Sequence, residues 1–124
     1  MNLKLMDGLF SVCRLNPTDK VPDWVFQSDF YSINKTEDEL SIVCEASLVP
    51  EIVKTEKYWS LIKVEGPLDF SLTGILSSLA KPLADEKISI FAISTFDTDY
   101  LLVKKENLSK AKSTLENSGF SFID

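Results

Sequence analysis

The second half of the chain alternates short apolar runs with one stretch in which apolar residues recur at helical spacing. Residues 58–64, 88–95 and 100–104 are rich in β-branched and aromatic side chains and are separated by polar residues, glycine or proline. Such runs predict strands. Between the first two, apolar residues recur at i, i+3, i+4, i+7 and i+11, which predicts one buried helix face over about residues 71–85. This stripe consists of Leu72, Ile75, Leu76, Leu79 and Leu83.

A second helix follows the third of these strands. Leu108, Ala111 and Leu115 have helical spacing, and Gly119 stands where a glycine commonly ends a helix. Residues 120–123 then form a last short apolar strand. The order of elements is therefore β-α-β-β-α-β, the order of a ferredoxin-like unit.

The first half repeats part of this pattern. Residues 9–15, 30–34 and 40–45 are predicted strands, and residues 21–26 leave room for little more than one helical turn. Asn16-Pro17 matches Gly66-Pro67 at an offset of 50 residues, whereas Tyr31-Ser32-Ile33 matches Phe91-Ala92-Ile93 at an offset of 60. The ten-residue difference predicts a shortened first helix.

The predicted fold class is therefore α+β. It consists of two ferredoxin-like (βαββαβ) units that share an antiparallel sheet, with a shortened helix in the first. We divide the chain into a reduced unit at residues 1–57 and a complete unit at residues 58–124. Each half is too small to bury much core alone, which favours a shared sheet.

Composition narrows the function classes. The net charge is −6 and Arg14 is the only arginine, so we expect no nucleic-acid binding. No apolar run approaches the length of about 18–20 residues that spans a bilayer. The first seven residues are too short and too soon acidic for a secretion signal. We therefore expect a soluble, cytoplasmic protein that does not bind membranes.

The sequence contains no histidine. This removes Ser-His-Asp and Cys-His catalysis, imidazole metal sites and the commonest general base near neutral pH. Cys13 and Cys44 lie in apolar strands and read as free core thiols, although a disulfide stays open. Two cysteines without histidine do not make a usual structural zinc site. We expect no cofactor, no metal and no enzymatic activity.

Two segments carry a resemblance to a known family. Residues 64–76, which contain Glu65-Gly66-Pro67-Leu68-Asp69, resemble the first strand, loop and helix of an ACT domain. Residues 90–103 resemble its second and third strands. The chain is most similar to small bacterial tandem ACT-domain proteins, to the ACT halves of CASTOR arginine sensors and to aspartokinase regulatory domains. The resemblance implies non-catalytic regulation through an amino acid or related small metabolite bound at the seam between ACT units.

The loop before the first predicted helix of the second unit supplies one group of candidate ligand-binding residues. Free N–H groups at a helix start can hold a carboxylate, and a glycine lets the backbone approach a ligand. The alternative is a plain turn with Asp69 as a helix cap, and close packing on the sheet would explain Gly74. The candidates here are Glu65, Gly66, Leu68, Asp69, Thr73 and Gly74.

The predicted hairpin tip supplies a second group, Thr95, Asp97, Thr98 and Asp99. Its two carboxylates can receive an ammonium group or a basic side chain. A plain turn or a weak divalent-cation site are the alternatives. The resemblance adds Ser47, Leu48 and Val49, whose counterparts in the related sensors lie at the seam. Apolar packing against Trp59 is the alternative for this segment.

The leading hypothesis is thus a regulatory module that binds an amino acid, forms a homodimer and acts on a separate regulated protein. One alternative is a protein-interaction or structural module without a ligand. Another is a small ferredoxin-like enzyme of acylphosphatase type, for which Arg14 and Asn16 would have to hold a phosphate.

Overall fold

The computed structural model describes residues 1–66 and 73–123, and it divides into two compact units. The discontinuous unit consists of Met1–Asp7 and Ser60–Asp124, and the inserted unit is Gly8–Trp59. The boundary near residue 59 lies close to the predicted one. The first seven residues, however, fold with the C-terminal half and not with the N-terminal half that the sequence suggested.

The discontinuous unit has the β-α-β-β-α-β order that the sequence predicts. Its elements are β5 (Lys54–Val64, shared with the inserted unit), α1 (Ile75–Asp85), β6 (Ile90–Ser94), β7 (Asp99–Lys104), the 3-10 turn η3 (Lys105–Asn107), α2 (Leu108–Asn117) and β8 (Ser121–Ile123). Strand β7 pairs with both β5 and β6. The ferredoxin-like unit predicted from the hydrophobic pattern is therefore confirmed.

An additional strand, β1 (Asn2–Leu5), explains why the N-terminal residues belong to this unit. It pairs antiparallel with β5, where Leu3 lies opposite Val64, and parallel with β8, where Leu3 lies opposite Phe122. The last strand of the unit thus pairs with β1, which lies between it and β5. Leu3 is fully buried, so the pairing also contributes an apolar side chain to the core.

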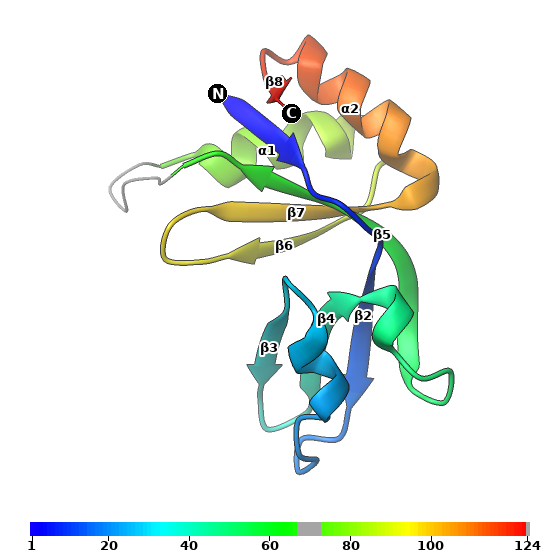
Figure 1. Cartoon of the computed structure of the whole chain (residues 1–124). Helices are drawn as coiled ribbons and strands as arrows, with labels where there is room; N and C mark the ends of the chain where they lie inside the picture. The colour runs from blue at the N-terminus through cyan, green and yellow to red at the C-terminus, as the bar shows by residue number, and fades with distance from the viewer. Residues whose placement is uncertain (67–72, 124) are drawn as a thin grey trace. The chain divides into compact units, whose positions relative to one another are not determined.

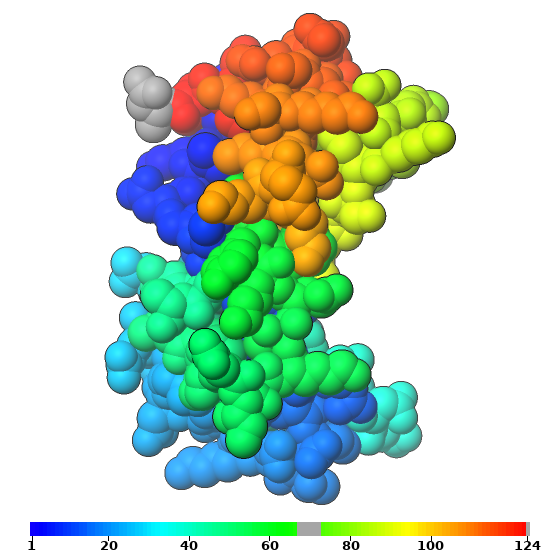
Figure 2. All heavy atoms as spheres, turned by 90° about the vertical axis from the view of Figure 1, so that its right-hand side faces the viewer, coloured from blue at the N-terminus to red at the C-terminus, as the bar shows by residue number. Residues whose placement is uncertain are grey.

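Both α-helices cover the same face of this sheet (Figure 1). Leu79 and Leu83 of α1 and Ala111 and Leu115 of α2 are fully buried, as the predicted stripes require. They pack against β-strand side chains of the core that include Ile62. The outer side of α2 is exposed and appears in orange on the surface in Figure 2. The helical periodicity in the sequence therefore identified the faces that build this core.

Glycines mark the start of α1 and the end of α2. Helix α1 begins at Ile75, later than the predicted start near residue 71, and Gly74 precedes it with a positive φ of 77°. Gly74 is thus the N-cap and not a first-turn residue. Gly119 has a φ of 100° just after the C-cap of α2, Ser118, which confirms its predicted place. Residues with a side chain are strained in this left-handed region.

The inserted unit repeats the strand order in a reduced form. It contains β2 (Phe10–Leu15), η1 (Asp23–Gln27), β3 (Ser32–Lys35), β4 (Leu40–Glu45), η2 (Ala46–Leu48) and the first part of β5. The strands pair antiparallel in the order β3-β4-β2-β5. Single 3-10 turns, η1 and η2, occupy the places of the two helices. The shortened first helix predicted from the offsets is confirmed by η1, which has five residues.

The two cysteines lie in the core of the inserted unit. Cys13 and Cys44 are free and buried, together with Val25, Leu40 and Ile42, which confirms the prediction of two core thiols. The side-chain hydrogen bond with Cys44 and burial both raise the pKa of the Cys13 thiol above its ordinary value. The Cys13 thiol is therefore held protonated, whereas the same hydrogen bond lowers the pKa of the Cys44 thiol.

Among the described residues, no helix is long and apolar enough to span a membrane, and α1 and α2 are the longest.

Candidate functional site

The structure brings part of the predicted site together in the discontinuous unit. A cavity of about 190 Å³ is lined by Lys63, Gly66, Asp97 and Thr98. Gly66, Asp97 and Thr98 were predicted from the sequence, whereas Lys63 was not. Gly66 follows β5, and the other two residues lie in the turn between β6 and β7. Residues more than thirty positions apart in the sequence thus face one small space.

Strand alternation explains the place of Lys63. The flanking residues Ile62 and Val64 are buried in the core beneath the helices. Successive side chains of a strand point to opposite faces, so Lys63 points away from that core. It is half-buried. A charged residue within the apolar run 61–64, three residues before Gly66, was the sequence signal that could have identified it.

Hydrogen bonds fix the turn that carries Asp97 and Thr98. The backbone N–H of Thr95 donates to the carbonyl oxygen of Thr98 at 2.8 Å, and the Thr95 hydroxyl donates to the same oxygen at 3.0 Å. The Thr98 hydroxyl donates to the Val64 carbonyl oxygen at 2.6 Å, and Thr98 is only 4% exposed. Thr95 and Thr98 therefore shape the turn and tie it to the end of β5.

The cavity presents one positive and one negative side chain, Lys63 and Asp97. An α-amino acid carries both charges, on groups attached to the same carbon atom, so its carboxylate and ammonium groups match this arrangement. Asp99 is the first residue of β7, opposite Ser94, and does not line the cavity. The two carboxylates of the turn are therefore not brought together in it. Among the described residues, no group of three or more acidic or cysteine side chains forms a metal site.

The other predicted residues near the first helix have different places. Glu65 is half-buried, and its backbone N–H donates to the Asn2 carbonyl oxygen at 2.9 Å. Thr73 and Gly74 are exposed at the start of α1 and do not line the cavity. A Cβ on Gly74 would meet only the Ser77 hydroxyl, at 3.7 Å, so close packing does not explain the glycine as the sequence suggested. The positive φ explains it. Leu68 and Asp69 lie outside the described residues.

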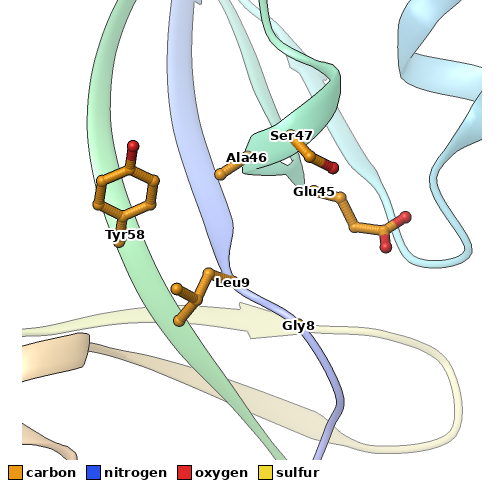
Figure 3. Close-up of a pocket in the computed structure, with 6 residues that line it drawn as sticks. All are labelled: Gly8, Leu9, Glu45, Ala46, Ser47 and Tyr58. Atoms are coloured by element: carbon orange, nitrogen blue, oxygen red, sulfur yellow. The ribbon is translucent and has the colours of Figure 1, made fainter.

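A second cavity, of about 520 Å³, belongs to the inserted unit (Figure 3). Its lining residues are Gly8, Leu9, Glu45, Ala46, Ser47 and Tyr58. Ser47 is the one predicted residue among them. Leu48 is half-buried, and Val49 packs on the core that contains the cysteines. Figure 3 shows Tyr58 on β5 at one side of this cavity, and Glu45 and Ser47 at the other.

Both tryptophans and the single arginine make structural contacts. Trp59 is buried and its indole N–H donates to the Glu56 carbonyl oxygen at 3.1 Å, and Trp24 packs on the core of the inserted unit. Arg14 Nη2 donates to the carbonyl oxygen of Asp38 at 2.8 Å, and Nη1 donates to that of Leu15 at 3.2 Å. With its guanidinium directed at backbone carbonyls, Arg14 does not form the phosphate cradle that the acylphosphatase alternative needs.

Known proteins share this architecture. The family model of the ACT domain matches residues 54–117. The chain belongs to the ACT domain family. A second family model, of an N-terminal domain, matches residues 8–63, which is nearly the inserted unit. The resemblance that the sequence showed in residues 64–76 and 90–103 is therefore confirmed.

Relatives of this ACT protein include regulators. It is 30% identical over 95 residues to the cytosolic arginine sensor for mTORC1 subunit 1 of Homo sapiens, a match that covers 70% of the chain and 29% of the sensor. The chain thus spans less than two thirds of the length of the curated relatives it matches.

Solved structures support the same fold. Protein Atu0741 from Agrobacterium tumefaciens is 40% identical with a TM-score of 0.93, covering 98% of this chain and 91% of that one. The regulatory subunit of aspartate kinase from Thermus thermophilus, at 10% identity and a TM-score of 0.64, covers 94% of this chain and 97% of that one. The second likeness concerns the fold alone.

Proposed function

We propose that this ACT protein binds a free amino acid, or a metabolite with the same adjacent ammonium and carboxylate groups, in the cavity lined by Lys63, Gly66, Asp97 and Thr98. The observation that carries the proposal is the presence of a lysine and an aspartate on one small cavity of an ACT unit. The Lys63 ammonium receives the carboxylate, and the Asp97 carboxylate receives the ammonium group. Charge-assisted hydrogen bonds of this kind are the stronger ones in proteins.

The size of the cavity limits what it can recognise. Its volume, about 190 Å³, is below the range of about 300–1,000 Å³ that is usual for small-molecule sites. The cavity therefore accommodates the charged part that all amino acids share, and the ligand's own side chain extends beyond it. Selectivity then depends on groups outside Lys63, Gly66, Asp97 and Thr98.

We further propose a regulatory role without catalysis, exerted on a separate protein in the cytoplasm. The name of one relative, a cytosolic arginine sensor, supports this role. A homodimer is part of the proposal, because β6 pairs only with β7 among the described strands and such an edge favours pairing with another chain. Light scattering of the purified chain would test the dimer.

The binding proposal is tested by a thermal-shift screen of the whole chain against the twenty standard amino acids at millimolar concentration. A ligand at about 100 times its Kd stabilises a protein by about 2.7 kcal/mol. Any amino acid that raises the Tm is then titrated by calorimetry into Lys63→Met and Asp97→Asn variants. Loss of one charge-assisted contact, about 1.5–3 kcal/mol, weakens Kd roughly ten- to a hundredfold.

Two matched variants control for general effects of charge. Asp99→Asn removes a carboxylate two positions away that does not line the cavity, and Lys20→Met removes an exposed lysine of the inserted unit. Both are expected to bind the amino acid like the unaltered protein. A screen without any hit, or equal weakening by Asp97→Asn and Asp99→Asn, would refute the proposed site.

A further inference from the structure

We infer that the inserted unit carries a second, independent ligand site, selective for small organic ammonium ions with an apolar body. The site is the cavity of about 520 Å³ lined by Gly8, Leu9, Glu45, Ala46, Ser47 and Tyr58. The inference goes beyond the proposed function, because it concerns another cavity, in the other unit, and a ligand that needs no carboxylate.

Glu45 provides the negative charge. Its Oε2 atom accepts a hydrogen bond from the Asp29 backbone N–H at 3.2 Å. Its Oε1 atom lies on the side of Gly8, 3.9 Å from the position that a Cβ would occupy there. Among the described residues, no lysine or arginine forms an ion pair with this carboxylate. One carboxylate oxygen is thus held in place while the other is left for a cation.

The backbone around Glu45 is held in position before any ligand arrives. The Glu45 N–H donates to the Ser28 hydroxyl at 3.0 Å, and that hydroxyl, on a nearly buried residue, donates to the Phe30 carbonyl oxygen at 2.6 Å. The Ala46 N–H donates to the Leu9 carbonyl oxygen at 2.9 Å. A site that is already ordered loses less entropy when it binds its ligand.

The rest of the lining gives the ligand its orientation. Leu9 and Ala46 contribute apolar surface, and the ring of Tyr58 lies across the cavity from Glu45 (Figure 3). The Lys57 ammonium is 6.0 Å from the centre of that ring, so positive charge is already present at the Tyr58 end. A cationic ligand therefore places its ammonium group at Glu45 and Ser47 and its apolar body against Leu9 and Tyr58.

The size of the cavity fits a ligand of this kind. About 520 Å³ lies within the usual range of about 300–1,000 Å³ for small-molecule sites. A carboxylate beside the ammonium group would lie near Glu45 and be repelled by it. The site is therefore expected to prefer an amine over the corresponding amino acid, which is the opposite preference to that of the Lys63 and Asp97 cavity.

The test uses 2-phenylethylamine, phenylacetate and phenylalanine as probes, titrated into the whole chain by calorimetry. The amine is expected to bind, phenylacetate is not, and phenylalanine is expected to bind this cavity at least about tenfold more weakly than the amine. Glu45→Gln keeps an oxygen for the Asp29 N–H and removes the charge, so it retains the fold and weakens the amine about tenfold or more. Glu51→Gln, at an exposed position of the same unit, is the matched control.

The crossed variants separate this site from the proposed amino-acid site. Asp97→Asn is expected to leave amine binding unchanged, and Glu45→Gln is expected to leave binding of an amino acid at Lys63 and Asp97 unchanged. If the amine does not bind, or binds Glu45→Gln as tightly as the unaltered protein, the second site is refuted whatever the amino-acid screen shows. If the amine binds through Glu45 and no amino acid binds, the proposed function fails and this inference stands.

Discussion

The Thr98→Val substitution isolates one hydrogen bond that ties the β6–β7 turn to the end of β5. The Thr98 hydroxyl donates to the Val64 carbonyl oxygen at 2.6 Å, and the side chain is 4% exposed. Valine has nearly the same shape as threonine, so the substitution leaves no cavity and adds no bulk. The substitution removes the hydroxyl donor, and the Val64 carbonyl oxygen loses this hydrogen bond in a buried place.

The expected cost follows from that loss. A buried polar group left without its partner costs about 1–3 kcal/mol of folding free energy. For a chain of 124 residues, each kcal/mol lowers the Tm by about 4 °C, which is between the values for smaller and larger domains. Thr98→Val is therefore expected to lower the Tm by about 4–12 °C.

Urea and thermal unfolding followed by circular dichroism would measure this effect. Thr18→Val, at an exposed threonine of the inserted unit, is the control and is expected to change the free energy of unfolding by less than about 0.5 kcal/mol. If Thr98→Val and Thr18→Val have the same Tm, the hydroxyl does not contribute as described, and the turn owes its place to the backbone alone.

Three further predictions concern the two cores and one helix start. Gly74→Ala should lower the free energy of unfolding by about 1–2 kcal/mol in urea titrations, because alanine is strained at a φ of 77° although its Cβ has room; an unchanged midpoint would contradict this. Leu79→Ala, at a fully buried position of α1, should cost about 2–5 kcal/mol in the same assay, and a cost below 1 kcal/mol would mean that the core collapses around the gap. The raised pKa of Cys13 means that the folded protein holds the thiol proton more tightly than the unfolded chain. Its contribution to stability is complete below the ordinary thiol pKa of about 8.5 and is lost as the pH rises above it. The hydrogen bond with Cys13 lowers the pKa of Cys44, which partly offsets this loss. The double variant Cys13→Ala/Cys44→Ala should therefore show a smaller decrease in stability between pH 7 and pH 10 than the unaltered protein.

Local sequence patterns predicted most of the fold because they report local geometry. The stripe that includes Leu79 and Leu83 identified the buried face of α1, and the offsets of the half-repeat identified the reduced helix of the inserted unit. Strand β1 was missed because its pairing partners are distant in the sequence. Its partners β5 and β8 lie about sixty and one hundred and twenty positions away, and a four-residue strand gives little periodicity of its own.

The candidate site was predicted less completely than the fold. Gly66, Asp97 and Thr98 were identified through turn chemistry and the family resemblance, and they do line one cavity. Lys63 was missed because one charged residue in an apolar run has no signature until the strand's two faces are assigned. Glu45 was missed because only the folded chain places its carboxylate beside Gly8.

The pairing of β1 with β5 and β8 has a consequence for the order in which the chain can fold during synthesis. The inserted unit is complete once Trp59 has been made, so it can fold while translation continues. The residues Met1–Asp7 have to wait for partners, since the Met1 carbonyl oxygen accepts a bond from the N–H of Ser121 at 3.1 Å. At about 5–20 residues per second, that wait lasts about 6–23 seconds. Until Ser121–Ile123 has been made, Leu3 therefore lacks its neighbour Phe122 and can pair only with Val64 of β5.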